Sequence, residues 1–391
     1  MRDLSIILPC LNEAETLGNC ILKAQKSIEA LKLDGEIIVA DNGSTDGSLE
    51  IAKNLGALVV HVKEKGYGNA LRGGIEAATG KWIIMADADD SYDFGQITPF
   101  VKKLQDGYDL VMGCRLPKGG GKIMKGAMPW KHRWIGNPLL SGIGRLFFES
   151  RATDFHCGMR AFTREAYQRI TPRTTGMEFA SEMVIKATLQ GLRIAEVPIT
   201  LYKDGRSRPP HLRSWRDGWR HLRFMLLYAP NWLFLLPGTV LMFVGLALTC
   251  WLLPGPRHLT DRVEIDIHTM VFGVIFTLMG AQIIAVGFFA KAFSYAERFD
   301  RNPRSLKRML RHVQLEHGLA LGGLLFLAGF AGCAWIAWQW AASGFGPLYV
   351  GMRAVLFWSM WMFLGLQVIF SSFFLSMLGI SRDTYVGDYE R

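Results

Sequence analysis

The segment IIMADADDSYDF, residues 83–94, constrains the fold more than any other part of the sequence. An apolar run ends there in four carboxylates, Asp87, Asp89, Asp90 and Asp93. In an extended chain, side chains two positions apart share a face, so Asp87 and Asp89 would repel each other unless a cation lay near them. Mg²⁺ takes oxygen ligands and is often held by one or two carboxylates together with substrate phosphates. The segment therefore predicts a metal and diphosphate site at a strand end, with an exposed acidic turn as the alternative.

Apolar runs of strand length alternate with helical segments through the first part of the chain. We predict strands at residues 4–10, at the start of 35–48, and at 57–62 and 81–89, with helices over 12–31, 46–56 and 69–80. Asn12 is expected to cap the first helix, with Glu13 and Glu15 in its first turn. This alternation argues for a mainly parallel α/β sheet, in which ligands bind beyond the carboxyl ends of strands. Asn12, Asp41 and Asp87 all fall at such ends.

A glycine-rich segment, GYGNALRGG at residues 66–74, follows the third predicted strand. It lacks the third glycine of a dinucleotide-binding fingerprint at the required place, so we give little weight to a dinucleotide-binding domain. Gly66 and Gly68 are instead expected to let the backbone approach a ligand, with an ordinary turn as the alternative.

Four long apolar segments without internal charge follow Tyr228. They cover residues 231–254, 268–290, 317–340 and 355–380, and each is long enough to cross a hydrocarbon core about 30 Å thick. Buried core helices are the alternative, which four such segments in succession disfavour. We predict a cytoplasmic α/β domain at 1–210, an interfacial amphipathic helix at 211–230 and an α-helical membrane domain at 231–391.

The charge distribution predicts a membrane surface as partner and no nucleic acid. The net charge is +10, and the excess clusters beside the apolar segments. The loop between the second and third segments carries Lys291, Arg298, Arg301, Arg304, Lys307, Arg308 and Arg311. By the positive-inside rule we expect a multi-pass integral membrane protein with both termini in the cytoplasm. Residues 1–13 do not have the pattern of a secretory signal.

The six cysteines form no CxxC pair, so we predict no metal-binding or catalytic role for these cysteines.

Two basic segments are interleaved with apolar residues. Residues 123–148 mix Lys and Arg with Met, Trp and Leu, and residues 203–226 contain Trp215 and Trp219. Such segments can lie in the membrane interface, and the first could admit a lipid phosphate. A mobile loop is the alternative for that segment. Lys203, Arg206 and Arg208 are expected to reach phosphates, with lipid headgroup contacts as the alternative.

The ordered motifs SIILPCLNEAETL, IIVADNGSTDGS, KGYGNALRGGIEAATG and MADADD resemble those of family 2 glycosyltransferases with a GT-A fold. GCRLPKGGG, RWIGNPLLSGIGRLFF and ATDFHCGMRAFTREA, which follow, are similar to polyprenyl-phosphate glycosyltransferases of the dolichyl-phosphate mannose or glucose synthase type. The resemblance covers residues 4–225. It implies an α/β GT-A domain followed by interfacial and transmembrane helices, four of them in this chain.

The resemblance also implies roles for individual residues. Pro9, Asn12, Glu13 and Asp41 would line the nucleotide base and ribose; Asp87 would lie against ribose or diphosphate; Asp89 would hold Mg²⁺ or Mn²⁺; Arg115 and Arg133 would face phosphates of the acceptor, with Arg160 nearby; and Asp154 would lie near the reacting centre. Asp154 as a structural cap or ion-pair partner is the alternative from the residues alone. The chain departs from many relatives at Asn42, where they have a second aspartate, which leaves the nucleotide open.

The expected reaction is inverting transfer of a hexose, from UDP-glucose or GDP-mannose, to a polyprenyl (dolichyl or undecaprenyl) phosphate. The acceptor phosphate is already anionic near pH 7, with a second pKa of about 6, so no general base is needed. The metal and Arg or Lys donors would stabilise charge on the leaving diphosphate.

Three alternatives remain beside this expectation. A processive polysaccharide synthase is disfavoured because no QxxRW motif is present. A transferase acting on a lipid hydroxyl is disfavoured because its acceptor carries no phosphate for Arg115 and Arg133 to bind. A non-catalytic protein that binds or flips lipid-linked sugars would not need Asp87 and Asp89. Small residues at 318–332 are expected to pack helices together, either within one chain or between protomers of a homo-oligomer.

Overall fold

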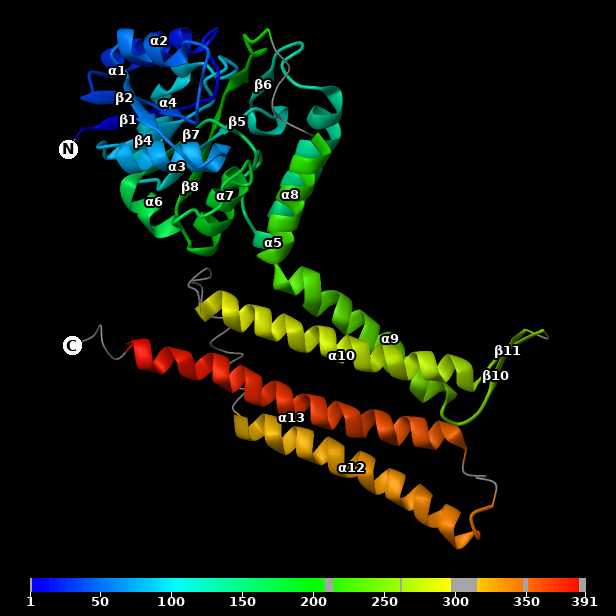
Figure 1. The fold of residues 1–391 in the computed structure, drawn as a ribbon. Coiled ribbons are helices and arrows are strands. Elements are labelled where there is room, and N and C mark those ends of the chain that lie inside the picture. The colour runs from blue at the N-terminus through cyan, green and yellow to red at the C-terminus, as the bar shows by residue number, and fades with distance from the viewer. Residues whose placement is uncertain (1, 208–213, 261, 297–314, 347–350, 387–391) are drawn as a thin grey trace. The chain divides into compact units, whose positions relative to one another are not determined.

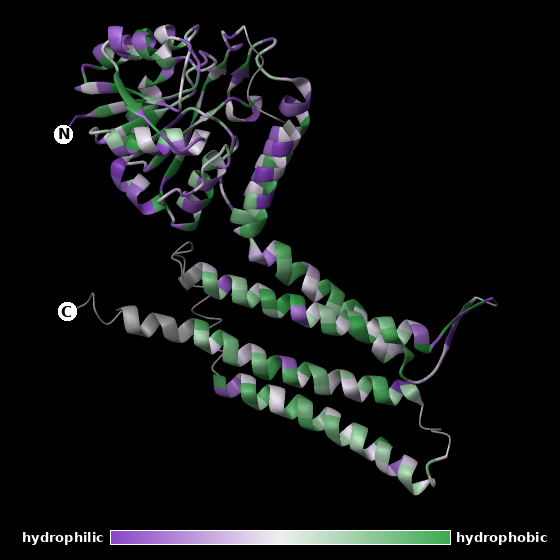
Figure 2. Cartoon of the chain, in the orientation of Figure 1, coloured by the Kyte–Doolittle hydropathy of each residue, from purple (hydrophilic) through white to green (hydrophobic). Residues whose placement is uncertain are grey.

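The computed structural model describes residues 2–207, 214–260, 262–296, 315–346 and 351–386. The chain divides into two compact units, Met1–Met225 and Leu226–Arg391. The first is an α/β domain, and the second consists largely of helices that are hydrophobic along most of their length (Figures 1 and 2). Arg208 and the basic residues 298–311 lie outside the described residues, so the membrane orientation stays a prediction.

The first unit is built on a sheet of seven described strands. They are β1 (Leu4–Cys10), β2 (Gly35–Asp41), β3 (Leu58–His61), β4 (Trp82–Met85), β5 (Leu110–Cys114), β7 (Arg160–Thr163) and β8 (Ile194–Pro198). Their order is β3-β2-β1-β4-β7-β5-β8, with β7 antiparallel to both neighbours and the other pairs parallel. The mainly parallel α/β sheet predicted from the sequence is confirmed.

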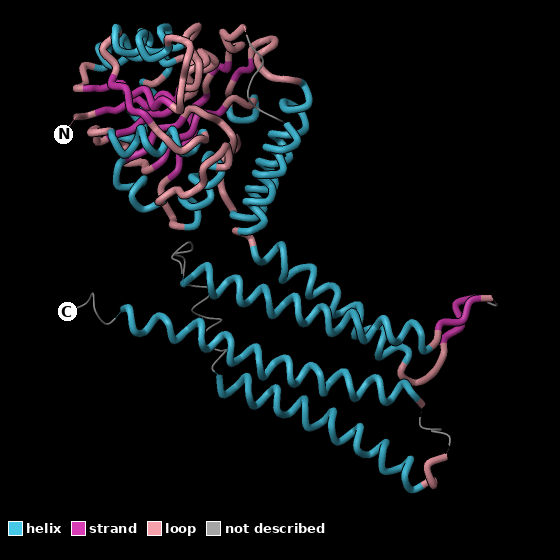
Figure 3. The backbone as a smooth tube through the Cα atoms, viewed as in Figure 1, coloured by secondary structure: helices cyan, strands magenta, loops and turns pink. Residues whose placement is uncertain are grey.

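Helices cover both faces of the sheet (Figure 3). The helices described between residues 2 and 227 are α1 (Leu17–Leu31), α2 (Ser48–Asn54), α3 (Tyr67–Ala77), α4 (Thr98–Gln105), α5 (Asn137–Phe148), α6 (Arg164–Ile170), α7 (Phe179–Leu189) and α8 (Ser214–Leu227), with short 3-10 helices η1 (Phe94–Gln96) and η2 (Pro117–Gly119) and a π-helix η3 (His132–Gly136). Of these, α8 lies beside the sheet and contacts α7 (Figure 1). A second small sheet pairs β6 (Lys122–Ile123) with β9 (Thr200–Leu201). Because both faces are covered, β1 reads in the sequence as a continuous apolar run instead of an alternating one.

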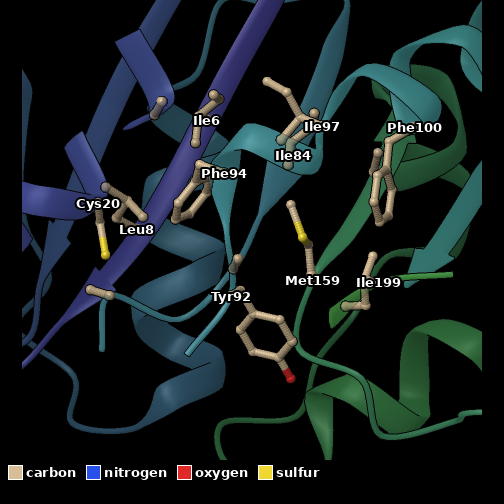
Figure 4. Close-up of a cluster of buried hydrophobic side chains, with 14 of the residues drawn as sticks. Ile6, Leu8, Cys20, Ile84, Tyr92, Phe94, Ile97, Phe100, Met159 and Ile199 are labelled. Atoms are coloured by element: carbon tan, nitrogen blue, oxygen red, sulfur yellow. The ribbon is translucent and has the colours of Figure 1, made fainter. Parts of the chain in front are cut away.

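The end of the acidic segment is held by the core of the first unit (Figure 4). Phe94 is fully buried in the same hydrophobic cluster as Ile6 and Leu8 of β1 and Ile84 of β4. Asp93, immediately before it, caps η1 by accepting a hydrogen bond from the Gly95 N–H. The loop between β4 and Phe94 is therefore fixed at both ends, at the carboxyl edge of the sheet.

Two local predictions are wrong. The helix expected from residue 12 begins at Leu17, because Asn12 has a φ of 59° and its side-chain oxygen accepts a hydrogen bond from the Thr45 N–H. Asn12 therefore joins two loops and caps no helix. The strand β4 ends at Met85, so Asp87 and Asp89 lie in the loop beyond it and the extended-chain argument for a shared face does not apply to them.

Helix α8 covers much of the segment predicted to be interfacial. Asp217, His221 and Met225 are buried, at a spacing of four residues, and the Nδ1 of His221 lies 2.8 Å from the Ser181 hydroxyl of α7. Trp215 and Trp219 are exposed, 94% and 58% respectively. The exposed face of the helix combines aromatic, apolar and basic side chains, namely Trp215, Trp219 and Leu227 with Arg216 and Arg223.

The second unit contains four helices, among the described residues, that are long and apolar enough to cross a membrane. Its elements are η4 (Asn231–Leu235), α9 (Leu236–Leu252), β10 (Arg257–Thr260), β11 (Val263–Ile265), α10 (Ile267–Ala296), α12 (Leu315–Ala342) and α13 (Met352–Val386). The candidate spans are Asn231–Leu252, Ile267–Ser294, Leu315–Ala342 and Met352–Leu378, as the sequence predicted. The small residues of 318–332 pack within the chain: a Cβ on Gly329 would lie 2.4 Å from the Met362 N of α13.

Candidate active site

The first strand-end cluster lies after β2. The carboxylate of Asp41 accepts a hydrogen bond from the Ser44 N–H at 2.8 Å and lies 3.2 Å from the ring nitrogen Nδ1 of His61. Burial alone would raise the pKa of Asp41, but the hydrogen bonds from Ser44 and His61 outweigh it and lower that pKa. Asp41 is therefore held as an anion at the carboxyl edge of the sheet.

Asn42, where many relatives have aspartate, has a structural reason to be an amide. Its Nδ2 donates to the carbonyls of Val62, at 3.1 Å, and Glu64, at 2.8 Å, while its Oδ1 accepts from the Gly66 N–H at 2.8 Å. A carboxylate could not donate the first two bonds. Asn42 thus fixes the path of residues 62–66 from β3 to the start of α3.

Gly66 and Gly68 face a protein loop. A Cβ on Gly66 would lie 2.2 Å from the Thr175 carbonyl oxygen, and one on Gly68 would lie 2.5 Å from that of Thr174. The same loop is held by Glu182, a fully buried carboxylate that accepts hydrogen bonds from the Thr174 N–H and hydroxyl. The close approach that these glycines allow is thus used by the chain itself, and ligand contact there stays a prediction.

Asp87 and Asp89 form the centre of the site. The Tyr67 hydroxyl donates to Asp87 at 2.7 Å, and the Ser91 N–H and hydroxyl donate to Asp89 at 3.1 and 2.5 Å. Burial, and then the negative charge of Asp89, raise the pKa of Asp87 to about 6. The carboxylate of Asp89 is therefore close enough to oppose the ionisation of Asp87.

The cation that meets these carboxylates is the guanidinium of Arg206. It pairs with Asp89, with Glu13 at 3.1 Å and with Asp204 at 3.4 Å, and its side chain is only 12% exposed. Burial would lower the pKa of Arg206, but Asp89 and Glu13 outweigh this and raise it. Sequence reasoning named Arg206 as a phosphate ligand, and missed its ion pair with the predicted metal ligand.

The donor set fits a hard divalent cation that shares its coordination with a substrate. Among the described residues, no group of three or more His, Cys, Asp or Glu side chains is arranged to hold a metal ion. Asp87 and Asp89 are two carboxylates under mutual repulsion, which a cation would relieve. Mg²⁺ or Mn²⁺ held by one or two carboxylates takes its remaining ligands from water and phosphate oxygens.

Arg115 and Asp154 form a buried ion pair. The Arg115 Nε and Nη2 each donate to an oxygen of Asp154 at 2.8 Å, and the Arg115 N–H donates to it at 3.1 Å. Burial would raise the pKa of Asp154, but the guanidinium outweighs this and lowers it. Both side chains are less than 10% exposed. The resemblance placed Arg115 on a phosphate and Asp154 near the reacting centre; the structure directs them at each other, as the ion-pair alternative had it.

Arg160 is also turned into the interior. It is fully buried, and it donates to the carbonyls of Phe155, Cys157 and Ala180. Its guanidinium therefore ties the chain before β7 to α7, and the expected position beside a phosphate is not what the structure shows. Tyr92, which the sequence did not single out, accepts hydrogen bonds from the Gly158 N–H and from Arg115.

The remaining predicted residues lie at the surface. Pro9 is partly exposed near the end of β1, and Lys203 is exposed on the same loop as Arg206. Arg133 stacks its guanidinium over the Trp134 ring at 5.3 Å. Four apolar side chains of the same segment are exposed, namely Trp130, Trp134, Ile135 and Leu139. Residues 130–139 thus combine basic and apolar groups on one surface segment, as predicted.

A mainly parallel sheet with carboxylates at its strand ends, followed by four apolar helices, is the architecture of a membrane protein with a GT-A-like domain. Residues 5–171 match the family model described as Glycosyl transferase family 2, and residues 288–379 match that of the glycosyltransferase family 2 C-terminal transmembrane region. The chain belongs to glycosyltransferase family 2, and it is an integral membrane protein.

Relatives from Haloferax volcanii are similar over different lengths. The low-salt glycan biosynthesis hexosyltransferase Agl6 is 36% identical over 96% of this chain and 89% of its own length. A dolichyl-phosphate hexose transferase is 30% identical over 50% of this chain and 82% of its own. Among solved structures, a Mycobacterium tuberculosis glucosyl-3-phosphoglycerate synthase in complex with Mn²⁺ and UDP has a TM-score of 0.47 and 22% identity, covering 58% of this chain and 80% of that one.

Proposed function

We propose that this protein is an inverting glycosyltransferase that moves a hexose from a nucleotide-sugar to a polyprenyl phosphate. The observation that carries the proposal is the pair at the carboxyl edge of the sheet, a half-buried Asp87 and a buried Asp89, with the Arg206 cation against Asp89. The kinship with a dolichyl-phosphate hexose transferase supports the acceptor class. The sugar is a hexose in both named relatives, and UDP-glucose and GDP-mannose are the donors to test first.

The donor would lie over the carboxyl ends of β1, β2 and β4. Asp41 and the loop fixed by Asn42 lie at one side of this edge, and Asp87 and Asp89 at the other. A divalent ion held by Asp87 and Asp89 would supply positive charge to the leaving diphosphate. Arg206 lies against Asp89, within reach of the same oxygens, and a planar guanidinium can bind a diphosphate through two parallel hydrogen bonds.

The acceptor side requires positive charge at an apolar surface and no general base. Residues 130–139 provide both, since Lys131 and Arg133 lie among exposed tryptophans. A phosphate monoester is already ionised near pH 7. Its oxygen can therefore attack the anomeric carbon in a single displacement, which inverts that centre.

Two other functions remain to be separated from this one. Transfer to a lipid hydroxyl such as that of diacylglycerol would need a base to remove the hydroxyl proton. A non-catalytic protein that binds or flips lipid-linked sugars would need no metal-dependent donor binding. The non-catalytic function does not explain why Asp87 and Asp89 lie close together, as a metal–diphosphate site does. Transfer to a lipid hydroxyl would use the same donor site, so only the acceptor separates it from the proposal.

The test is a transfer assay on the purified full-length protein in detergent. Labelled UDP- and GDP-sugars are offered with Mg²⁺ or Mn²⁺ and either a polyprenyl monophosphate or diacylglycerol, and label in extracted lipid is measured. We expect one donor to label only the polyprenyl phosphate, and EDTA to abolish the reaction.

The variant Asp89→Asn should lower transfer by at least about 100-fold, the scale for loss of one charge-stabilising contact. Asp93→Asn is the matched control, because Asp93 belongs to the same acidic segment but caps η1, and it should leave transfer unchanged. Full activity of Asp89→Asn, with unaltered Mn²⁺ binding, would exclude the metal assignment. Label in diacylglycerol, or no transfer from any donor by folded protein, would exclude the proposed acceptor.

A further inference from the structure

Two membrane helices carry the same sequence pattern. Residues 280–289 read GAQIIAVGFF in α10, and residues 365–374 read GLQVIFSSFF in α13. Glycine, glutamine, isoleucine and the two phenylalanines recur at identical spacing. The two stretches are offset by 85 positions, the separation of Gln282 and Gln367.

The helices that precede them repeat as well. Gly238, Gly245 and Trp251 of α9 have the same spacing as Gly322, Gly329 and Trp335 of α12. Glycines are common in membrane helices, so the spacing alone proves little. The contacts that these glycines make provide an independent comparison.

Equivalent glycines meet equivalent backbone atoms. A Cβ on Gly280 would lie 2.4 Å from the Met242 N and 2.6 Å from the Gly238 carbonyl oxygen. A Cβ on Gly365 would lie 2.4 Å from the Phe326 N and 2.6 Å from the Gly322 carbonyl oxygen. Met242 and Phe326 occupy the same place in the two patterns, as do Gly238 and Gly322.

The other two glycines behave in the same way. A Cβ on Gly245 would lie 2.4 Å from the Thr277 N, and one on Gly329 would lie 2.4 Å from the Met362 N. Thr277 and Met362 are again equivalent positions. The α9–α10 hairpin and the α12–α13 hairpin are therefore packed alike, atom for atom along their closest line of approach.

The hairpins meet along α10 and α13, which lie next to each other (Figure 1). Gln367 donates to Gln282 at 2.7 Å, and the rings of Phe289 and Phe374 lie 4.6 Å apart. In both contacts a residue touches its own counterpart in the repeat. Contact between equivalent residues is the signature of a two-fold axis. Because α10 and α13 run in the same direction, this axis lies along the helices and the membrane normal.

The glutamine pair lies deep in the predicted spans. Gln282 and Gln367 each follow the first residue of their span, Ile267 and Met352, by the same number of positions. At 1.5 Å per residue this corresponds to roughly 22 Å along each helix, within the hydrocarbon region of about 30 Å. Amides at that depth need polar partners, since neither lipid tails nor water supply them there.

We propose that the membrane unit is a tandem repeat of one helical hairpin, and that its seam at Gln282 and Gln367 is the self-association surface of that hairpin, occupied within the chain by the second copy. The pair fixes the register of the hairpins, because a shift of one turn would separate the amides and the Phe289–Phe374 rings together. The second hairpin thus has a role independent of the proposed transfer reaction: it supplies the amide that pairs with Gln282 without a second chain.

The test uses the full-length chain in membranes, with Cys250→Ser and Cys333→Ser as background and a protease site placed between α10 and α12. The double variant Gln282→Cys/Gln367→Cys is oxidised with copper phenanthroline, cleaved and run on a non-reducing gel. The expected result is that the two halves stay joined at the mass of one chain. In the matched control Gln282→Cys/Phe363→Cys, the second cysteine lies one turn earlier on an exposed face. Its two fragments should separate after cleavage, because no disulfide joins them.

Cross-linked dimers of chains, from the double variant or from a mixture of the single ones, would overturn the proposal. So would equal cross-linking of the control pair, or no cross-linking of the Gln282→Cys/Gln367→Cys pair while both cysteines still react with a membrane-permeant thiol reagent.

A second measurement, of thermal stability, needs no cross-link. Gln282→Leu and Gln367→Leu should lower the melting temperature equally, and the double variant should lower it less than either, because it leaves no unpaired amide. Unequal single effects, or a double effect equal to their sum, would contradict a symmetric pair. None of these outcomes depends on transfer activity, so they are separable from failure of the proposed function.

Discussion

Replacement of Asp154 by asparagine tests whether this residue anchors the fold or takes part in the reaction. The carboxylate is fully buried and receives three hydrogen bonds from Arg115, two from the guanidinium and one from the backbone. In Asp154→Asn the guanidinium remains buried without a counter-charge, and one of its N–H groups faces the amide NH₂ group instead of an acceptor.

The expected loss follows from the burial of both partners. Removal of one member of a buried ion pair costs about 3–5 kcal/mol, because the other charge is left uncompensated. For a unit of this size, 1 kcal/mol corresponds to about 2–4 °C in melting temperature. Asp154→Asn should therefore lower the melting temperature by roughly 6–20 °C.

The assay is thermal unfolding of the full-length protein in detergent, with transfer activity measured well below the transition. Asp106→Asn is the matched control, since Asp106 is exposed and its contact with Lys103 is 4.0 Å long, so the change should cost about 0.5 kcal/mol or less. The double variant Arg115→Met/Asp154→Leu removes both charges and should recover most of the lost stability. An unchanged melting temperature with abolished transfer would refute this reasoning and make Asp154 a chemical participant.

Two further predictions concern other parts of the chain. Burial lowers the pKa of His221 to about 4, although Asp217 on the same helix opposes this, so the unfolded state binds the extra proton first as pH falls. Stability should then decline from about pH 6.5 to about pH 4, by up to about 3 kcal/mol from this group. His221→Asn should reduce that slope without removing it, because burial also lowers the pKa of the facing His156 ring, and Arg160 is the charge that faces both rings. In the membrane unit, Gly280→Leu should force α9 and α10 apart and reduce the monodisperse fraction in size-exclusion chromatography, whereas Gly323→Leu, with nothing within 4 Å of its Cβ, should not.

The strands and spans were predictable because their signals are local. A strand covered on both faces must be apolar at nearly every position, and LSIILPC and GEIIVAD show this directly. A membrane span likewise shows its apolar length. The start of α1 was not predictable, because Asn12 is held in a left-handed conformation by Ser44 and Thr45, which are distant in sequence.

In the candidate site, too, the residues with local sequence signals were predictable, and the contacts between residues distant in sequence were not. Asp41, Asp87 and Asp89 could be placed at strand ends because Asp41 ends β2, and Asp87 and Asp89 follow β4. Their partners could not, since Arg206 is 117 positions from Asp89 and no spacing rule connects them. The resemblance named Arg115 and Asp154 without relating them to each other, because which side chain each would meet depends on packing that the motifs do not encode.

The position of Arg206 makes a last prediction, on what the acidic segment does before a donor arrives. The guanidinium of Arg206 forms an ion pair with the Asp89 carboxylate. A metal ion that binds Asp89 must therefore displace this guanidinium. Arg206→Met removes this competitor, and we expect Mn²⁺ alone, titrated by electron paramagnetic resonance, to bind several-fold more tightly than to the unaltered protein. The same change removes a donor to the diphosphate, so kcat/KM for transfer should fall. Arg206→Lys, which keeps the charge but not the planar fork, should restore the weak Mn²⁺ binding without restoring transfer. Tighter metal binding with slower transfer would show that one guanidinium balances the carboxylates in the free protein and the diphosphate in the complex, whereas weaker Mn²⁺ binding in Arg206→Met would mean that Arg206 orders the site and does not compete for it.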